Sequence, residues 1–261
     1  MALTYSNGLS HSVERVHRFA AVQKVLGVLL MIFCLSMLPP LVVSWWYEDG
    51  ASRAFLQGLW ITLVSGAVLW WPVRHHQPEL KVRDGFLVTV VLWTVLSVYG
   101  AIPFYVTNAG WHSFAEALFE SVSGLTTTGA TVISAGLDQL PPSLLYYRAQ
   151  LHWLGGMGII VLAVAVLPML GIGGMQLYRA ETPGPMKESK LTPRIRETAR
   201  ALWIVYVLLT AVCFATYWAL GMSPFDALCH AFSTIATGGF STHDASIGFF
   251  GDPPPEWVVV L

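Results

Sequence analysis

Apolar stretches long enough to cross a bilayer alternate with short charged segments along the chain. Segments free of Lys, Arg, Asp and Glu cover residues 25–47, 54–73, 85–115, 149–178 and 201–225. Since a membrane-spanning helix needs about 20 predominantly apolar residues, the pattern predicts five spans, with cores near 22–46, 54–71, 86–106, 149–170 and 200–220. The final stretch EWVVVL, at 256–261, looks like the start of a sixth span, so we expect the chain to be a fragment.

The composition supports a membrane protein. Of the 261 residues, 55% are hydrophobic and 11% are charged, whereas a soluble domain carries about 25% charged residues. We therefore expect an all-α polytopic protein of the lipid bilayer. The net charge of −1 gives no indication of nucleic-acid binding. Cys34, Cys213 and Cys229 show no CxxC or Cys/His spacing, and we expect them to be buried thiols without a redox or metal role.

The distribution of basic residues predicts the orientation of the spans. Of the 14 Lys and Arg residues, only Arg53 and Arg148 lie on the connections that follow the first span and precede the fourth. All the others lie on the N-terminal segment or on the connections at the opposite ends of the spans. Because cytoplasmic connections are enriched in Lys and Arg, we expect a cytoplasmic N-terminus, with 107–148 and 221–256 on the outer side.

Two segments on the predicted outer side repeat each other. Residues 113–131 (SFAEALFESVSGLTTTGAT) and 223–241 (SPFDALCHAFSTIATGGFS) align position by position without a gap. Six of the 19 aligned positions are identical, among them Gly129 and Gly239. Each copy follows one predicted span, and an internal repeat is stronger evidence for a structural unit than one copy alone.

Each copy is too short to cross a membrane. It opens with Ser-x-x-acid, which is typical of a helix N-terminus, with Glu116 and Asp226 as cap residues. About 12 helical residues then cover about 18 Å, roughly half of a 30 Å hydrocarbon core. We expect each copy to enter the membrane and to turn back through non-helical backbone, which is tolerated only inside protein or beside water.

The Thr/Gly cluster at the end of each copy is the predicted turning point. Free carbonyl oxygens and helix C-termini at this depth form a site for a dehydrated cation. We interpret the two clusters as strands of a selectivity filter. The alternative is that TTTGA and ATGGF are helix C-caps on ordinary outer loops.

The fourth predicted span holds polar and small residues near its outer end. Arg148 and His152 lie one helical turn apart, and we expect both side chains to reach toward the membrane interface. The run GGMG at 155–158 favours close helix packing, with a hinge as the alternative.

An intramembrane hydrolase is an alternative from another class of protein. Glu116 and Glu120 share a helix face, and His152 lies in a predicted span. The sequence lacks the HExxH and GxSxG motifs, and no pair of carboxylates lies within a predicted span. We therefore expect no enzymatic activity.

Three motifs resemble those of the bacterial Trk/Ktr potassium-transporter membrane subunits. They are SVSGLTTTGATV (121–132), HWLGGMGIIVLAVAVLPMLGIGG (152–174) and AFSTIATGGFST (231–242). The resemblance implies four helix–pore-loop–helix repeats around one K⁺ pathway, preceded in some members by two extra transmembrane helices. It divides the chain into a cytoplasmic N-terminus with two N-terminal transmembrane helices (1–80), a first repeat with its cytoplasmic loop (81–198) and a second repeat truncated at the start of its last helix (199–261).

Carried onto this sequence, the resemblance implies two filter strands. They are Thr126, Thr127, Thr128, Gly129 and Ala130, and Ala236, Thr237, Gly238, Gly239 and Phe240. It also implies K⁺ as the transported ion, the bacterial cytoplasmic (inner) membrane as the location, a homodimer, and a cytosolic nucleotide-binding regulatory subunit as a partner. Channel-like transport and coupling to H⁺ or Na⁺ both stay open. Because the implied pore needs four strands, the alternative is a truncated, non-conducting fragment that only assembles with other subunits.

Overall fold

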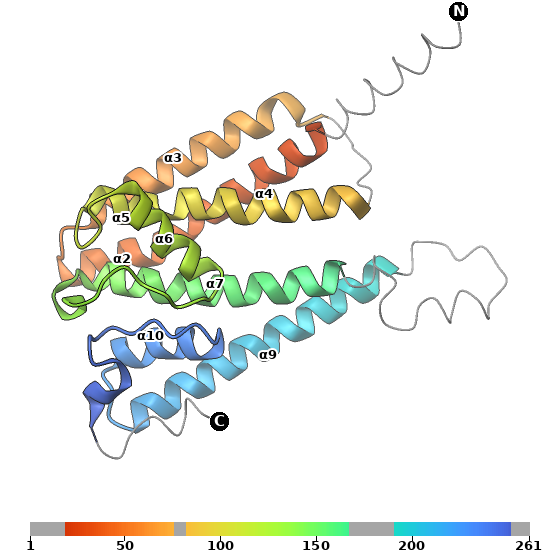
Figure 1. Cartoon of the computed structure of the whole chain (residues 1–261). Coiled ribbons are helices and arrows are strands. Elements are labelled where there is room, and N and C mark those ends of the chain that lie inside the picture. Colours follow the sequence, from red (N-terminus) through yellow and green to blue (C-terminus); the bar gives the residue numbers. More distant parts are fainter. Residues whose placement is uncertain (1–18, 76–81, 167–190, 252–261) are drawn as a thin grey trace, which may run out of the picture.

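The structure is a computed structural model that describes residues 19–75, 82–166 and 191–251. Within these ranges every regular element is a helix. The long helices run roughly parallel to one another, and successive ones point in opposite directions (Figure 1). The all-α class predicted from the sequence is confirmed.

Four helices in the described part of the chain are long and apolar enough to cross a membrane. They are Phe19–Tyr47, Ser52–Val73, Leu87–Thr107 and Glu197–Ala219, and they coincide with the first, second, third and fifth predicted spans. The fourth predicted span lies on α7 (Pro142–Val166), a helix of 25 residues. The end of that span near residue 170 and the predicted sixth span at 256–261 lie outside the described residues.

Prolines divide the first and third long helices. The first passes through η1 (Cys34–Met37) before α2 (Leu38–Tyr47), which carries prolines in its first turn. The third consists of α4 (Val82–Gly100) and α5 (Ile102–Thr107), and α5 also has a proline in its first turn. Because proline lacks the backbone N–H that would bond to the preceding turn, the hydrogen-bond ladder is interrupted at both places.

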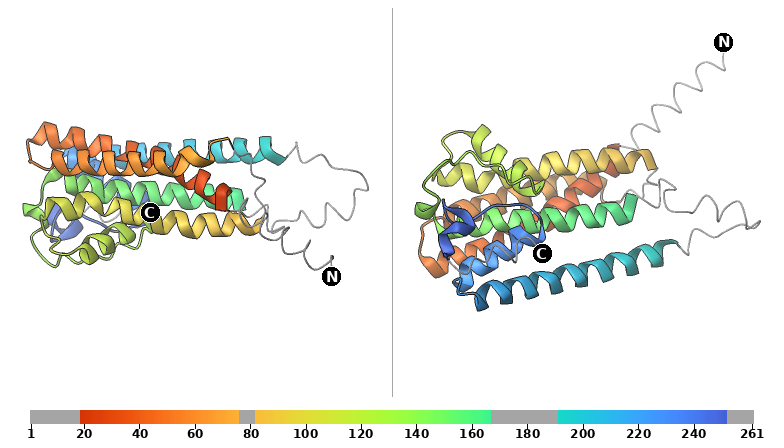
Figure 2. Two further views of the ribbon diagram at one scale, coloured as in Figure 1. Left: turned by 90° about the horizontal axis from the view of Figure 1, so that it is seen from above. Right: turned by 60° about the horizontal axis from the view of Figure 1, so that its bottom comes forward.

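Helix α7 lies in the middle of the bundle. The remaining elements are α3 (Ser52–Trp70), η2 (Trp71–Val73), α6 (Phe114–Leu125), η3 (Leu137–Gln139), α9 (Leu191–Ala219), α10 (Pro224–Ile235) and η5 (Ser246–Phe250). Helices α2, α6, α9 and α10 all pack against α7. The two 12-residue helices, α6 and α10, lie at the same end of the bundle, on different sides of α7 (Figures 1 and 2).

Basic residues meet at one end of the bundle, and an aspartate binds backbone N–H groups at the other. At the end away from α6 and α10, the Lys24 ammonium donates a hydrogen bond to the Arg74 carbonyl at 3.1 Å. At the opposite end, the Asp49 carboxylate accepts backbone N–H groups from Ala51 at 3.1 Å and Ser143 at 2.9 Å. Two of the basic residues predicted to be cytoplasmic therefore share one end, and both short helices lie at the other.

An aromatic core fills the end that holds α6. Phe55, Phe104, Trp111 and Tyr147 are fully buried there, with ring centroids 4.6 to 5.4 Å apart. Burying one such side chain contributes about 1.5–3 kcal/mol, so this cluster anchors the segment that leads into α6. The three cysteines are buried free thiols, as predicted.

Candidate functional site

Each short helix begins at a serine cap. Ser113 Oγ accepts a hydrogen bond from the Glu116 N–H at 3.2 Å, and Ser223 Oγ accepts one from the Asp226 N–H at 3.1 Å. The Glu116 carboxylate in turn accepts the backbone N–H of His112 at 2.7 Å. The predicted cap role of Glu116 is confirmed, and so is the length of 12 residues for both helices. The Asp226 carboxylate instead accepts the hydroxyl groups of Ser223 at 2.7 Å and Thr242 at 2.8 Å.

Both short helices end in the same backbone motif. In the first copy, the Thr127 N–H donates to the Gly124 carbonyl at 3.1 Å, and the Thr128 N–H donates to the Ser123 carbonyl at 2.9 Å. The second copy repeats both bonds at the aligned positions. This pair of bonds is the Schellman motif, which needs a residue in the left-handed conformation. That residue is a threonine in both copies, with φ of 54° at Thr127 and at Thr237.

The helix-cap interpretation is correct for one residue of each Thr/Gly segment. Thr127 and Thr237 do end the helices, although a left-handed backbone costs a residue with a Cβ about 1–2 kcal/mol. Two residues beyond each cap, Gly129 and Gly239 are left-handed again, with φ of 74° and 97°. A helix cap does not require this second left-handed residue, so capping alone does not explain the Thr/Gly segments.

The two Thr/Gly segments lie against each other. A Cβ atom added at Gly129 would overlap the carbonyl oxygen of Gly238, so a glycine is needed for this approach. At Gly239, by contrast, an added Cβ would have no heavy atom within 4 Å. The two glycines therefore share a backbone conformation, and they differ in their surroundings.

Two consecutive glycines let α7 run between the ends of both short helices. A Cβ at Gly155 would overlap the Leu125 carbonyl at the end of α6. A Cβ at Gly156 would lie 3.2 Å from the Cβ of Ala236, just after α10. The prediction of close packing for the GGMG run is confirmed.

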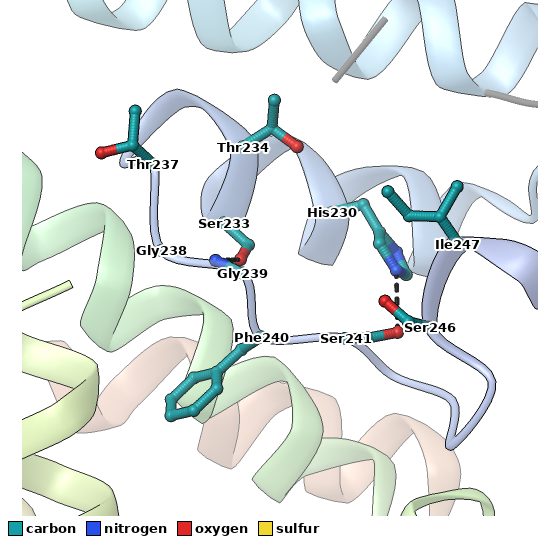
Figure 3. A pocket seen from close by; sticks show the side chains of 10 residues that line it. All are labelled: His230, Ser233, Thr234, Thr237, Gly238, Gly239, Phe240, Ser241, Ser246 and Ile247. Atoms are coloured by element: carbon teal, nitrogen blue, oxygen red, sulfur yellow. Dashed lines mark hydrogen bonds between the residues drawn. The ribbon is translucent and has the colours of Figure 1, made fainter. Parts of the chain in front are cut away.

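A cavity of about 290 Å³ lies beside the second Thr/Gly segment (Figure 3). Half of its lining residues carry hydroxyl groups; the full set is His230, Ser233, Thr234, Thr237, Gly238, Gly239, Phe240, Ser241, Ser246 and Ile247. Ser233 Oγ accepts the Gly239 N–H at 2.9 Å, and His230 Nε2 lies 3.1 Å from Ser241 Oγ (Figure 3). Both bonds attach the segment to α10.

The expectation that Arg148 and His152 reach the membrane interface is wrong. The Arg148 residue is 1% exposed and His152 is fully buried. Arg148 Nε donates to the Glu120 carboxylate at 2.7 Å, and the His152 ring stacks on Phe240 with centroids 4.1 Å apart. Burying a charge is costly unless the charge is paired, and Glu120 supplies the pair. A signal was present in the sequence, since charged residues in apolar helices of membrane proteins tend to face the protein interior and pair.

The loops that follow the two segments are also joined. The Asp244 carboxylate accepts the backbone N–H groups of Gly136 at 2.8 Å and Leu137 at 3.0 Å. The His243 ring hydrogen-bonds to Asp138. This bond favours the charged form of the Asp138 carboxyl and therefore lowers its pKa.

Comparison with known proteins identifies the family. The family described as "TrkH: Cation transport protein" matches residues 51–261. The chain belongs to the TrkH family. The potassium uptake protein TrkH of Salmonella typhimurium is 53% identical over 243 residues, which are 93% of this chain and 50% of the relative. TrkH of Halomonas elongata is 58% identical over 235 residues, covering 90% of this chain and 48% of the relative.

A solved TrkH structure has the same fold. The crystal structure of the potassium transporter TrkH from Vibrio parahaemolyticus superposes with a TM-score of 0.78 at 50% identity, covering 90% of this chain and 46% of that one. The resemblance to Trk-type transporters and the multi-pass membrane fold are thus confirmed. The relatives are transport proteins and not enzymes. The chain spans about half the length of the TrkH relatives that it matches.

Proposed function

We propose that this chain forms half of a potassium uptake pore. Its Thr/Gly segments would be two strands of the selectivity filter, with ligand oxygens from Thr126, Thr127, Thr128, Gly129, Ala236, Thr237, Gly238 and Gly239. The observation that carries the proposal is the close approach of Gly129 to the Gly238 carbonyl. This contact brings the Thr/Gly segments of the two sequence repeats directly against each other. Backbone carbonyls replace the hydration shell of K⁺, and the C-terminal ends of α6 and α10 add partial negative charge.

The proposed pore needs further repeats beyond this chain. We assign 1–80 to the cytoplasmic N-terminus and two N-terminal transmembrane helices, 81–198 to a first repeat and 199–261 to a second repeat. Two more repeats would come from the half of the relatives that the chain does not match. We further propose the bacterial inner membrane, a homodimer and a cytosolic nucleotide-binding regulatory subunit. The relatives' names, which describe parts of a Trk system, support a multi-subunit assembly.

One observation favours the second candidate function, a non-conducting fragment that only assembles with other subunits. The chain covers 50% of its Salmonella typhimurium relative. The proposed pore is tested with a full-length transporter, made by continuing this chain with the second half of that relative, and the second candidate is tested with the chain 1–261 alone. We expect this transporter to restore growth of a potassium-uptake-deficient bacterium on low K⁺.

Gly239→Ser in this transporter tests the filter assignment. An added Cβ at Gly239 meets no neighbour, so the substitution strains the backbone without a clash. Since such strain costs about 1–3 kcal/mol, we expect discrimination against Na⁺ to fall roughly tenfold. The measurement is ⁸⁶Rb⁺ uptake with and without competing Na⁺, at matched membrane abundance.

Gly221→Ser is the matched control for Gly239→Ser. Gly221 has a φ of 99° and equally open surroundings, and it lies in the turn before α10, away from the filter segments. We expect this control to keep the parent's discrimination. Normal discrimination in Gly239→Ser would return the segments to the helix-cap interpretation, and an equal loss in both variants would show general backbone strain.

The proposed orientation predicts the location of two reporter fusions. A reporter fused at Pro185 should be cytoplasmic, and one fused at Gly136 should be on the outer side, because all but two of the basic residues lie on the proposed cytoplasmic segments. Accessibility to a membrane-impermeant thiol reagent at single cysteines introduced in these places provides a second measurement. Finding Gly136 in the cytoplasm would overturn the orientation.

A further inference from the structure

Arg148 lies where the ends of the two Thr/Gly segments come together. Its Nε donates to the fully buried Glu120 carboxylate at 2.7 Å. Its Nη1 donates to the Ser241 carbonyl at 3.2 Å, and its Nη2 donates to Thr131 Oγ1 at 3.4 Å. Thr131 follows the first segment and Ser241 follows the second. One guanidinium group therefore bonds to both.

Each short helix also bonds to the residue that directly follows its own segment. Thr131 Oγ1 lies 3.0 Å from both carboxylate oxygens of Glu120 on α6. In the alignment of the two copies, Glu120 corresponds to His230 and Thr131 to Ser241, and His230 Nε2 lies 3.1 Å from Ser241 Oγ. In both copies, therefore, the short helix bonds to the hydroxyl group of the residue at the aligned position after the Thr/Gly segment. The first copy does so with a buried carboxylate, and Arg148 neutralises it.

Helix α7 holds the second segment through two neighbouring side chains. Phe240 lies between the Arg148 guanidinium, whose Cζ is 4.2 Å from the ring centroid, and the His152 ring, which stacks on it at an interplanar angle of 15°. His152 Nδ1 is 3.1 Å from Ser233 Oγ, which accepts the Gly239 N–H. Arg148 and His152 are four residues apart and therefore share one face of α7. This face contacts the second segment.

We propose that Arg148 is a positioning residue that sets the relative placement of the two filter strands, so that ion discrimination depends on its guanidinium group. The inference rests on the proposed function. Arg148 bonds to none of the proposed ion ligands and acts through Thr131, Phe240 and Ser241. A planar guanidinium directs its five N–H donors along fixed lines, which a lysine ammonium does not reproduce.

A pair substitution separates positioning from folding. Removing one member of a buried ion pair leaves an unpaired charge and strongly destabilises a protein, whereas replacing both members with apolar residues of similar volume is often neutral or stabilising. The pair variant Glu120→Leu with Arg148→Met should therefore fold and insert. It lacks the donors to Ser241 and Thr131, so it removes the positioning contacts without leaving a buried charge.

The test measures how strongly Na⁺ competes with ⁸⁶Rb⁺ in the full-length transporter. We expect the pair variant to reach the membrane at the parent's abundance. The Na⁺ concentration that halves ⁸⁶Rb⁺ uptake should fall about tenfold, the size expected for losing a hydrogen bond to a charged group. Arg148→Lys should show a smaller fall, because it keeps the charge and loses the geometry.

Gln150→Leu is the matched control on the same helix. Gln150 is also buried, and its Nε2 donates to the Ser36 carbonyl at 2.7 Å, away from the filter segments. We expect parent-like Na⁺ competition in this variant, whatever its abundance. A fall equal to that of the pair variant would show that any buried polar contact of α7 has this effect, and it would overturn the assignment to Arg148.

Parent-like Na⁺ competition in the pair variant at matched abundance would overturn the proposal. If the pair variant does not insert, Arg148→Lys and Thr131→Val decide, and parent-like competition in both overturns it. The filter proposal fails separately: it fails if the full-length parent takes up no ⁸⁶Rb⁺, or if Gly239→Ser discriminates normally. The Arg148 inference fails alone when Gly239→Ser loses discrimination and the Arg148 variants keep it.

Discussion

Gly129→Ser is expected to reduce ⁸⁶Rb⁺ uptake by the full-length transporter at least about thirtyfold, since overpacking and left-handed strain each cost about 1–3 kcal/mol. The Cβ atom of the new residue would overlap the Gly238 carbonyl. The obstacle is backbone, so no side-chain rotation can relieve it. The two strands must separate, and the proposed oxygen ring must widen. The measurement is initial uptake at matched membrane abundance.

Gly136→Ser controls for the left-handed backbone at Gly129. Gly136 has a φ of 95° and open surroundings, and it lies further along the same loop. We expect this variant to transport like the parent. Gly129→Ser should also be more severe than Gly239→Ser, because only Gly129 faces an obstructing carbonyl. If Gly129→Ser transports as well as Gly239→Ser, the contact between the two strands is not part of the conducting structure.

The chain 1–261 on its own is expected to give no potassium uptake above the empty-vector level. It supplies two of the four proposed strands, so a dehydrated K⁺ would find ligands on one side of the pathway only. The measurement is growth of a potassium-uptake-deficient bacterium on low K⁺, together with ⁸⁶Rb⁺ uptake into liposomes that hold purified protein. The full-length transporter is the positive control.

Robust uptake by purified 1–261 would contradict this expectation. It would mean that two copies of the chain supply all four strands. A cross-link between single cysteines placed in the Thr/Gly segments of different copies would then detect such an assembly. Failure of both the short chain and the full-length transporter would instead count against the potassium uptake proposal.

Features encoded by neighbouring residues could be predicted from the sequence. The serine caps, the two short helices and the Thr/Gly ends depend on residues within about one or two helical turns. Their recurrence in the second copy strengthened each of these predictions. Glu116 shows this clearly: its cap role depends on Ser113 and His112, which lie close to it in sequence and in space.

Features that depend on distant partners could not be predicted in this way. Arg148 can be buried because it bonds to Glu120 and Ser241. These partners lie 28 residues before it and 93 residues after it in the sequence. Its position near the end of an apolar span made an interfacial side chain the expected result. The alignment also treated Gly129 and Gly239 as equivalent. Their difference arises from the tertiary contact with Gly238, which the repeat alone does not encode.

The contacts of Arg148 have a consequence for how the protein is made. At a synthesis rate of about 5–20 residues per second, roughly 5–20 s pass between the emergence of Arg148 and that of Ser241, 93 residues later. Throughout this interval Glu120 is the member of the network already synthesised that can neutralise the guanidinium while α7 enters the bilayer. The interval therefore gives the nascent first copy time to insert and form its ion pair before the second Thr/Gly segment leaves the ribosome, so that the second segment can dock onto contacts that are already in place.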